Sequence, residues 1–501
     1  MSKRTLNRRD FLRLAGGLAA GTLVAACQPK TVVVEKEVEK VVTQVVKETV
    51  KETVVVAGTP KVMEKEVTKV VEKVVTATPP PPEPVTIDVQ SGWCANAEAG
   101  CDVWTPAIQM FNEQYPDITV ELIATGVSPE DMMTAMAGGV APDVYHFYVG
   151  GWTELMARGV MFPLDDLIDG ADYFDPGIYL PPQWEYCQWD GKIYGIPVLE
   201  GGANPAFSWH KPLLEEIGAD AENGPQNWEQ VLDWAKKLNQ YDEAGNLVRV
   251  GYDPLDAWGV TVLNWTMAFD APYISGDKRT MLFDQGNWRQ GLEAIAQLWQ
   301  DAGVEKVAAF NQEWGYWTGY ESSGFGNGKR AMITNGVWQP GDMKKTAGTT
   351  GIDPTTIGYT WHPCLNEGKK YVNFGQEHTL FMPKLTDAPG ESFKFMAHMT
   401  SVEVNLLEFD IRGACMWSKP ILEVLDLDSI PGLRWFFDAP SEADTLFNPG
   451  MVNTPIQTQV ESLWRRAVEE AIYGAKTPEQ ALVDINAELQ QSLDEYWEAQ
   501  G

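Results

Sequence analysis

Residues 85–93 read VTIDVQSGW, an alternation of apolar and polar residues that predicts a strand followed by a loop. Residues 102–122, DVWTPAIQMFNEQYPDITVEL, predict a helix, a turn and a second strand. Residues 132–147, MMTAMAGGVAPDVYHF, predict another helix, a turn at two glycines and a third strand. Alternation of strand, helix and strand indicates an α/β fold with a largely parallel sheet.

Later segments continue this pattern with amphipathic helices. PQNWEQVLDWAKKLNQ (225–240) has apolar residues at helical spacing, and WRQGLEAIAQLWQDAG (288–303) ends at a glycine. Residues 457–499 predict two helices that are separated near Gly474 and Pro478. We therefore expect strands and helices to alternate up to a final helix pair.

Net charge and length limit the number of domains and the classes of binding partner that this chain can have. The chain has 501 residues, 70 of them acidic and 38 basic, which gives a formal net charge of −32. This length allows two or three domains. A protein this acidic is a poor partner for nucleic acid or for an anionic membrane surface. The 20 tryptophans suit a core, an interface or a ligand platform, so their number alone assigns no role.

The first 27 residues are typical of an export signal. RRDFL at 8–12 resembles a twin-arginine signal, and VAAC at 24–27 resembles a lipoprotein cleavage box. We expect cleavage before Cys27 and attachment of a lipid to its thiol; an uncleaved signal anchor is the alternative. Because the removed part carries five basic residues and one acidic residue, the exported chain would have a net charge of −36.

Residues 28–84 are a separate region of Val, Glu, Lys and Thr that ends in TATPPPPEP. Valines at 38, 41 and 45, and at 67, 70 and 74, recur at intervals of three and four, which is helical or heptad-like spacing. Three interpretations stay open: a disordered spacer, a transient helix and a self-associating stalk. We favour a partly helical linker with a stiff polyproline end, which would hold the folded part away from the membrane.

Five cysteines follow Cys27, and an exported location permits disulfides. Cys94 and Cys101 enclose a short loop and are the best candidates for a disulfide. The other three are Cys187, Cys364 and Cys415, and their pairing stays open. Because five is an odd number, at least one thiol stays outside a disulfide. No Cys-x-x-Cys motif occurs, so we expect no zinc site, and the sequence predicts no cofactor.

Signatures of catalysis are missing from the sequence. The chain has no Gly-x-Ser-x-Gly elbow and no His-Glu-x-x-His motif. Its five histidines are scattered, and no two of them are four residues apart. We therefore expect a protein that is not an enzyme, while the abundant carboxylates keep a glycosidase pair open as an alternative.

Several short motifs occur in a characteristic order: FNEQYPDITV (111–120), APDV (141–144), DGKIYGIP (190–197), the helix within 224–238, FGNGKRAMITNGVW (325–338) and NFGQEHTLFMPK (373–384). Their order resembles that of the extracellular solute-binding proteins of ABC importers, in the large sugar-binding family that includes maltose-binding protein. The resemblance covers about residues 85–500 and implies a two-lobe periplasmic-binding-protein-like α/β fold with hinge crossings. Lobe one would comprise about 85–200 and 377–412, and lobe two about 204–373 and 413–501.

The same resemblance implies a ligand site in a cleft between the lobes. It places Trp338 against a sugar ring, because aromatic rings cover the C–H face of a pyranose and polar groups bond its hydroxyls. Gly336 would let the ligand approach the backbone, and packing of Trp338 beneath a helix is the alternative. The other candidates correspond to cleft positions of the family: Trp93, Tyr148, Trp152, Glu200, Asn204, Trp265, Gly375, Gln376, Glu377, Met416 and Trp417.

The resemblance also implies a function. The chain would be a lipid-anchored receptor on the outer face of the cytoplasmic membrane, which binds a sugar or related small solute and delivers it to an ABC transporter permease. Ligand would favour the closed state, because only that state makes contacts from both lobes. Two other classes stay open: a secreted, lipid-anchored carbohydrate-active hydrolase and a stalked surface interaction protein. The sequence does not identify the solute.

Overall fold

The computed structural model describes residues 41–56, 59–74, 84–96, 98–126, 128–147, 152–201, 205–256, 261–315, 322–366, 368–373, 378–447 and 453–500. The chain divides into two compact units, Met1–Pro82 and Glu83–Gly501. The division falls in the proline-rich end of the low-complexity region.

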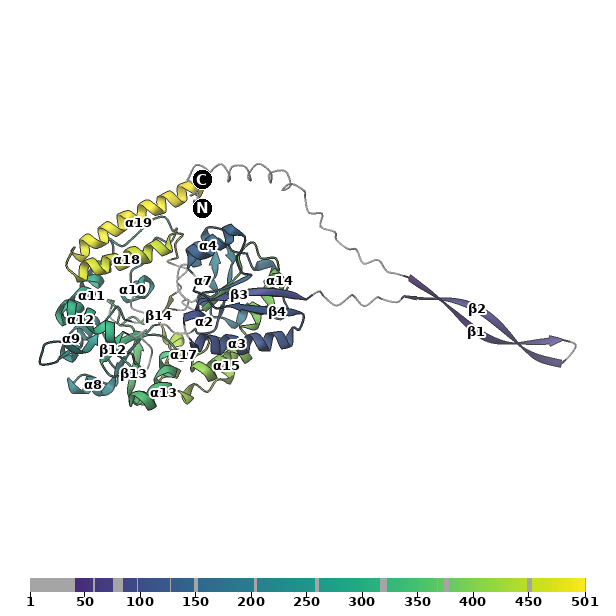
Figure 1. The fold of residues 1–501 in the computed structure, drawn as a ribbon, viewed down its shortest axis with the longest axis horizontal. Coiled ribbons are helices and arrows are strands. Elements are labelled where there is room, and N and C mark those ends of the chain that lie inside the picture. Colours follow the sequence, from purple (N-terminus) through teal and green to yellow (C-terminus); the bar gives the residue numbers. More distant parts are fainter. Residues whose placement is uncertain are drawn as a thin grey trace, which may run out of the picture. The chain divides into compact units, whose positions relative to one another are not determined.

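The first unit contains a long antiparallel hairpin (Figure 1). Strand β1 (Val41–Val56) pairs with β2 (Thr59–Val74) from Val41↔Val74 to Val56↔Thr59. The prediction of a partly helical linker is therefore wrong for these residues. Valine and threonine lose side-chain freedom in a helix and fit a pleated strand, so this preference outweighs the spacing of three and four.

The second unit holds two five-stranded sheets, one in each lobe. The strands of the first lobe are β3 (Val85–Ser91), β4 (Ile118–Ile123), β5 (Val144–Phe147), β8 (Gly195–Val198) and β15 (His378–Phe381). Their order is β4-β3-β5-β15-β8. β3 is parallel to β4 and β5, and β15 is antiparallel to both of its neighbours.

The strands of the second lobe are β9 (Ala206–His210), β10 (Gln240–Tyr241), β11 (Leu247–Tyr252), β12 (Arg330–Asn335) and β13 (Ile357–Trp361). Their order is β10-β11-β12-β9-β13, in which β11 is parallel to β12 and β9 is antiparallel to β12 and β13. Both sheets are mixed, so the prediction of a largely parallel sheet is wrong. The antiparallel strands β9 and β15 enter directly after the chain crosses between lobes, and residue periodicity does not encode strand direction.

Helices cover both faces of the first sheet. Ile87 and Val89 pack with Trp104 and Phe111 on one face, and Tyr145 packs with residues of the other helix layer. The helices are α2 (Gly92–Asn96), α3 (Glu98–Gln114), α4 (Pro129–Gly138), α5 (Trp152–Ala157), α6 (Asp165–Asp169), α7 (Pro181–Tyr186), α14 (Pro389–His398) and α15 (Val402–Arg412). The predicted strand–helix–strand order of residues 85–147 is confirmed.

The second sheet is covered in the same way (Figure 1). The helix predicted within 225–240 begins where the Asn227 side chain accepts the Gln230 N–H, and the helix predicted within 288–303 ends at Gly303 with φ 94°. The helices are α8 (Lys211–Glu216), α9 (Trp228–Leu238), α10 (Val262–Ala268), α11 (Trp288–Ala302), α12 (Val304–Trp314), α13 (Gln339–Thr350), α16 (Lys419–Val424), α17 (Leu433–Glu442), α18 (Gln457–Ile472) and α19 (Pro478–Gln500).

Three segments connect the lobes. The first crossing lies between β8 and β9, the second between β14 (Tyr371–Asn373) and β15, and the third between α15 and α16. The remaining short elements are β6 (Gln188–Trp189), β7 (Lys192–Ile193), β16 (Thr445–Phe447) and the 3-10 turns Pro176–Ile178, Pro354–Thr356 and Leu427–Ser429.

Candidate functional site

The carboxyl ends of the first lobe's strands carry a cluster of polar side chains. Ser91 ends β3, His146 lies in β5, and His378 begins the antiparallel β15, so all three reach the same edge of the sheet. The Ser91 hydroxyl lies 2.8 Å from Nδ1 of His146, and Nε2 of His146 lies 3.1 Å from Nδ1 of His378. Ligands of open α/β sheets bind outside the carboxyl ends of the strands, which makes this edge the candidate site.

Glu200 extends the cluster to all three crossings. Its Oε2 lies 3.6 Å from Nε2 of His378, and its Oε1 pairs with Nη2 of Arg412. Its backbone N–H donates to Oε1 of Glu408 at 3.0 Å. Glu200 lies in the first crossing, His378 ends the second, and Arg412 begins the third. We call this set the hinge cluster: Ser91, His146, Glu200, His378, Glu408 and Arg412.

Burial sets the protonation of the hinge cluster. It lowers the pKa of His146 to about 3, and it lowers the pKa of His378 well below its usual range, with further contributions from His146 and Arg412. Both imidazoles are therefore neutral at pH 7. Burial raises the pKa of Glu200 against the opposing effect of Arg412, and burial and then Glu200 raise the pKa of Glu408. The Glu200–Arg412 pair thus lies beside uncharged rings.

Trp93 packs on this cluster. The guanidinium carbon of Arg412 lies 5.1 Å from the centroid of the Trp93 ring, and the His378 ring meets that ring edge-on at 4.5 Å. The next residue, Cys94, forms a disulfide with Cys101, with Cα atoms 4.5 Å apart. The disulfide and Arg412 together fix α2, the short helix that carries Trp93, a residue that is only 6% exposed.

Trp338 directly precedes α13 at the end of the segment that follows β12. It is buried in an apolar cluster that includes Phe325, Val337 and Met343. A Cβ atom added to Gly336 would overlap the indole of Trp338. The space at Gly336 is therefore filled by the indole itself, and contact between Trp338 and a ligand stays a prediction.

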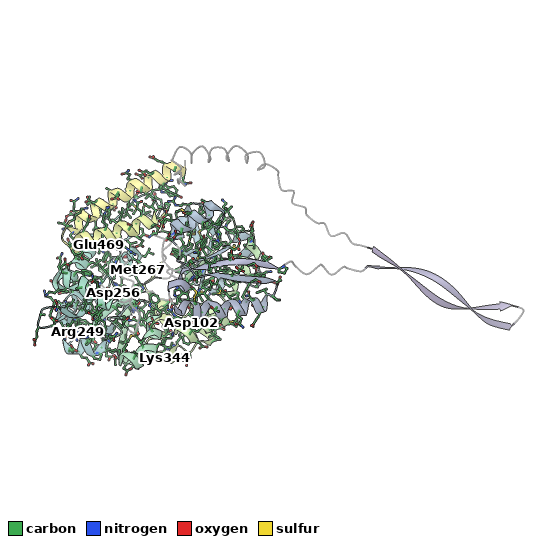
Figure 2. All side chains as sticks on the ribbon, viewed as in Figure 1. Asp102, Arg249, Asp256, Met267, Lys344 and Glu469 are labelled. Atoms are coloured by element: carbon green, nitrogen blue, oxygen red, sulfur yellow. A yellow bond between two sulfur atoms is a disulfide. The ribbon has the colours of Figure 1, made fainter. Side chains whose placement is uncertain are left out.

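A buried charge anchors the strand that leads to Trp338. Arg330, the first residue of β12, is fully buried, and its Nε lies 2.8 Å from Oδ2 of Asp256, which is labelled in Figure 2. Its Nη1 lies 3.4 Å from Oδ2 of Asp253, and its Nη2 donates to Asn311 at 2.9 Å. These partners tie β12 to the loop after β11 and to α12, which fixes the start of the Trp338 segment.

The other tryptophans predicted to bind ligand are also buried. The indole N–H of Trp152 donates to the Tyr186 hydroxyl at 3.0 Å, and Trp265 stacks on Phe269 with centroids 5.2 Å apart. Both lie in the apolar clusters of their own lobes. The backbone of Trp417, in the third crossing, donates to the Gly201 carbonyl at 3.0 Å in the first.

Only part of the predicted site falls within the described residues. The structure brings Trp93 and Glu200 together around Arg412 and His378. Met416 and Trp417 lie in the third crossing and are buried. The remaining predicted ligand residues and the predicted lipidation site lie outside the described residues: Tyr148, Asn204, Gly375, Gln376, Glu377 and Cys27.

A second polar contact links α5 with α18. Glu154 of α5 is buried, binds Arg158 through hydrogen bonds of 2.7 and 3.0 Å, and accepts the Thr458 N–H of α18 at 3.4 Å. The Tyr496 hydroxyl of α19 donates to the Ala157 carbonyl at 2.9 Å. The final helix pair therefore bonds to the first lobe while its apolar residues pack in the second.

The family model for bacterial extracellular solute-binding proteins matches residues 106–412. The chain belongs to this family. The match covers more than half of the sequence and includes every strand of the two five-stranded sheets except β3. It agrees with the family resemblance of the sequence motifs.

This solute-binding protein is similar to three known proteins in sequence or in structure. The sn-glycerol-3-phosphate-binding periplasmic protein UgpB of Rhizobium meliloti (strain 1021) is 22% identical over 272 residues, 52% of this chain and 60% of that protein. CpMnBP1 with mannobiose bound has a TM-score of 0.70 at 18% identity, covering 81% of this chain and all of that one. An ABC transporter solute-binding protein from Thermotoga lettingae TMO, bound with α-D-tagatose, has a TM-score of 0.66 at 20% identity, covering 82% and 100%.

These likenesses show the two-lobe fold. The chain spans 60% or less of the length of the curated relatives that it matches. Among the residues that the structure describes, no three His, Cys, Asp or Glu side chains are grouped to hold a metal ion. None of the helices in the described part of this solute-binding protein combines enough length and apolar character to cross a membrane.

Sequence reasoning missed five members of the hinge cluster: Ser91, His146, His378, Glu408 and Arg412. The two histidines are 232 residues apart, so their contact leaves no local motif. Judged by spacing alone, their scattered positions indicate only the absence of a catalytic motif. A usable signal was position, because His146 lies near the end of the third predicted strand and His378 directly follows the second crossing.

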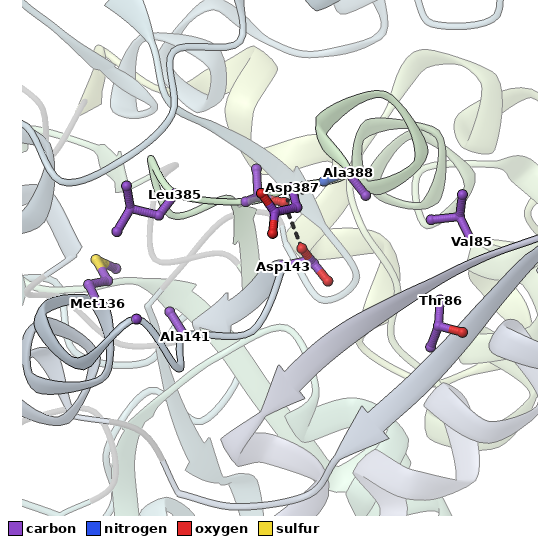
Figure 3. A pocket seen from close by; sticks show the side chains of 10 residues that line it. Val85, Thr86, Met136, Ala141, Asp143, Leu385, Asp387 and Ala388 are labelled. Atoms are coloured by element: carbon purple, nitrogen blue, oxygen red, sulfur yellow. Dashed lines mark hydrogen bonds between the residues drawn. The ribbon is translucent and has the colours of Figure 1, made fainter. Parts of the chain in front are cut away.

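A pocket of about 460 Å³ lies at the other end of the first sheet (Figure 3). Val85, the first residue of β3, lines it, whereas the hinge cluster includes Ser91, the last residue of that strand. Asp143 in its wall accepts hydrogen bonds from the Thr386 hydroxyl at 2.7 Å and from the Asp88 N–H at 3.0 Å. Among the predicted ligand residues that the structure describes, none lines this pocket, and Asp143 is already bonded within the protein.

Proposed function

We propose that this chain is an extracytoplasmic receptor that binds a small solute between its lobes and delivers it to the permease of an ABC importer. The observation that carries the proposal is the hinge cluster. One buried carboxylate contacts residues at all three crossings, and it lies at the strand ends where α/β sheets bind ligands. Closure of two lobes about a few residues between them is a recurring way to enclose a ligand.

We propose a neutral carbohydrate or related polyol as the solute. The relatives are named for, or hold, polyhydroxylated molecules: glycerol phosphate, mannobiose and tagatose. A net charge of −32 disfavours an anion among them. Within the described part, the guanidinium at the candidate site, that of Arg412, already pairs with Glu200.

The proposed ligand residues combine flat rings with hydrogen-bonding groups. Aromatic rings would cover the C–H face of a sugar, and carboxylates and amides would bond its hydroxyls. They are Trp93, Trp152, Trp265, Trp338, Trp417, Tyr148, Glu200, Asn204, Gln376 and Glu377. Among the described ones, Trp93 has the strongest support because it packs on Arg412 and His378.

A thermal-shift screen of the exported chain against sugars and polyols, followed by product analysis, tests this proposal. A solute that binds only the native state raises the melting temperature increasingly as its concentration exceeds the Kd, and it is recovered unchanged. We expect Trp93→Ala to lose that shift. Trp497→Ala, on α19 against Arg279, is the matched control and should keep it. Recovery of cleaved sugar would replace the receptor by the hydrolase alternative.

We further propose that a lipid on Cys27 tethers the receptor to the outer face of the cytoplasmic membrane after twin-arginine export. The motifs RRDFL and VAAC support this route. Residues 28–84 would then act as the linker between the lipid and the binding domain. Labelling of cells with a fatty-acid probe should mark the native chain and not Cys27→Ala, and Arg8→Lys/Arg9→Lys should stay in the cytoplasm. A labelled Cys27→Ala chain would refute the anchor.

A further inference from the structure

The first turn of α18 is capped from the opposite lobe. Among the described residues at this helix end, the N-cap residue Ile456 offers no side-chain oxygen, and the first turn has no acidic residue. Helices α4, α9 and α15 instead begin at Ser128, Asn227 and Ser401, whose own side chains accept an N–H of the first turn. The first N–H groups of α18 therefore need an acceptor from another element.

Glu154, on α5 of the first lobe, supplies this acceptor. Its Oε2 accepts the N–H of Thr458, the second residue of α18, at 3.4 Å, which is a position that capping side chains serve. Its Oε1 accepts from Nε and Nη2 of Arg158 at 3.0 and 2.7 Å. The Glu154 side chain is only 9% exposed. One oxygen thus bonds the arginine that orients the carboxylate, and the other bonds the helix end. We call the bond to Thr458 the cross-lobe cap.

A bond in the opposite direction serves the C-terminal end of α5. The carbonyls of residues 154–156 accept N–H groups from the three residues that follow this helix. The remaining carbonyl of the last turn, that of Ala157, accepts the Tyr496 hydroxyl of α19 at 2.9 Å. Each lobe therefore satisfies a backbone group at a helix end of the other lobe. Both bonds require the lobes to be together.

We propose that Glu154 is a positioning residue for the solute site, which favours the closed arrangement of the lobes through the cross-lobe cap. The pair with Arg158 lies within the first lobe and persists when the lobes separate, whereas the bond to Thr458 does not. A helix cap changes the equilibrium that it biases by a factor of about 2 to 30. Closing the lobes should therefore become less favourable by that factor when Glu154 is removed.

Interlobe distances in the solute-free chain, residues 28–501, test the proposal. Spin labels at Tyr173→Cys in the first lobe and Tyr473→Cys in the second lie at exposed positions, and the thiols that the structure leaves outside the disulfide are buried. We expect Glu154→Ala to move the distance distribution away from the native one. Glu293→Ala is the matched control, because it breaks an arginine pair of the same spacing within α11, and it should leave the distribution unchanged. An unchanged distribution in Glu154→Ala would overturn the proposal.

Glu154→Gln keeps the size of the side chain and an acceptor oxygen and removes the charge. It should shift the distances in the same direction as Glu154→Ala and by less, because the amide still accepts the Thr458 N–H but interacts less with the helix dipole. This variant also decides the question if Glu154→Ala does not fold. Native distances in Glu154→Gln, together with a misfolded Glu154→Ala, would show a structural role alone and overturn the proposal.

A second-site variant separates the cross-lobe cap from the stability of α18 itself. Gln459→Glu places a carboxylate in the first turn of α18, where its oxygen can accept from Ser492, the present partner of Gln459. This charge moves with α18 and acts equally in both arrangements, so it shifts no equilibrium between them. Added to Glu154→Ala, it should leave the altered distances in place. Return of the native distances would show that Glu154 acts only through helix stability, and would overturn the proposal.

The effect on affinity rests on the proposed function. Because apparent affinity scales with the fraction of the binding-competent state, Glu154→Ala should raise the Kd of every solute by the same factor, of up to about 30. Mannobiose and tagatose serve as probes. Unequal factors for the two would mean that Glu154 contacts the solute, which would overturn its role as a positioning residue. If neither sugar binds the native chain, the proposed function loses support, while the solute-free distances still decide the role of the cross-lobe cap.

Discussion

Replacing Arg412 by methionine removes the cation of the hinge cluster and keeps most of the side-chain volume. Glu200 is then left buried with His378, which is neutral. Its cheapest response is to take up a proton. For an unfolded-state pKa of about 4.3, holding that proton at pH 7 costs about 3.7 kcal/mol, and at pH 5 about 1 kcal/mol. Loss of the Trp93 contact adds about 0.5–2 kcal/mol at any pH.

The expected sign follows from the direction of the shift. In the variant the pKa of Glu200 lies further above its unfolded value, so the stability linked to this group is full below pH 4.3 and falls as pH rises. Urea denaturation should therefore show a destabilisation by Arg412→Met of about 4–6 kcal/mol at pH 7 and about 1.5–3 kcal/mol at pH 5. A loss that is equal at the two pH values would refute the reasoning.

Two further variants isolate the buried charge. Adding Glu200→Gln to Arg412→Met removes the group that must be protonated, so the double variant should regain about 2–3 kcal/mol at pH 7. Arg434→Met is the exposed control: Arg434 pairs with Asp428, and both side chains are at least half exposed. It should change the stability far less than Arg412→Met does, with little difference between pH 5 and 7, because solvent screens an exposed pair.

Three other substitutions give separate tests. Burial raises the pKa of Glu461 to about 7, so the stability linked to this carboxyl is complete below its unfolded-state pKa of about 4.3 and is lost as pH rises through 7. Urea denaturation should therefore show Glu461→Gln to be more stable than the native chain at pH 8 by up to about 3 kcal/mol and equal to it at pH 4. Cys94→Ser/Cys101→Ser should lower the free energy of unfolding by about 2 kcal/mol, because the disulfide closes a loop of sequence separation 7; equal stability with and without reductant would contradict this. Gly336→Ala should lose about 1–3 kcal/mol through overlap with Trp338, whereas Gly348→Ala in the same region, with open space around it, should gain slightly in a melting experiment.

Local patterns in the sequence determined much of the fold in advance. The alternation in residues 85–91, the capped helix after Asn227 and the break between the last two helices all appear where periodicity and capping place them. These features depend on neighbours within one or two turns of chain. Strand direction does not, and β9 and β15 are antiparallel because the chain has just crossed between lobes.

The candidate site was less accessible to sequence reasoning. The family resemblance predicts Trp93 and Glu200, but nothing local identifies the pairing of Glu200 with Arg412, 212 residues later. The spacing of the histidines along the chain gives no sign of their contact, because His146 and His378 meet only where two strands bring them to one end of the sheet. The valine spacing of three and four wrongly predicted a helix in the hairpin. A segment rich in β-branched residues can show the same spacing and still prefer a strand.

Two of the polar contacts between the lobes differ in strength, which predicts where the lobes separate. The hinge cluster joins the crossings through a buried ion pair and a 3.0 Å bond from the Glu200 N–H. The contact between Glu154 and the Thr458 N–H is a single bond of 3.4 Å at a helix end. Rotation about the crossings can keep the hinge cluster intact, whereas it must break the bond between Glu154 and the Thr458 N–H. Amide hydrogen exchange should therefore be faster at Thr458 than at Glu200, and solute should slow Thr458 selectively. Equal protection of the two amides, with and without solute, would mean that the hinge cluster is not the pivot.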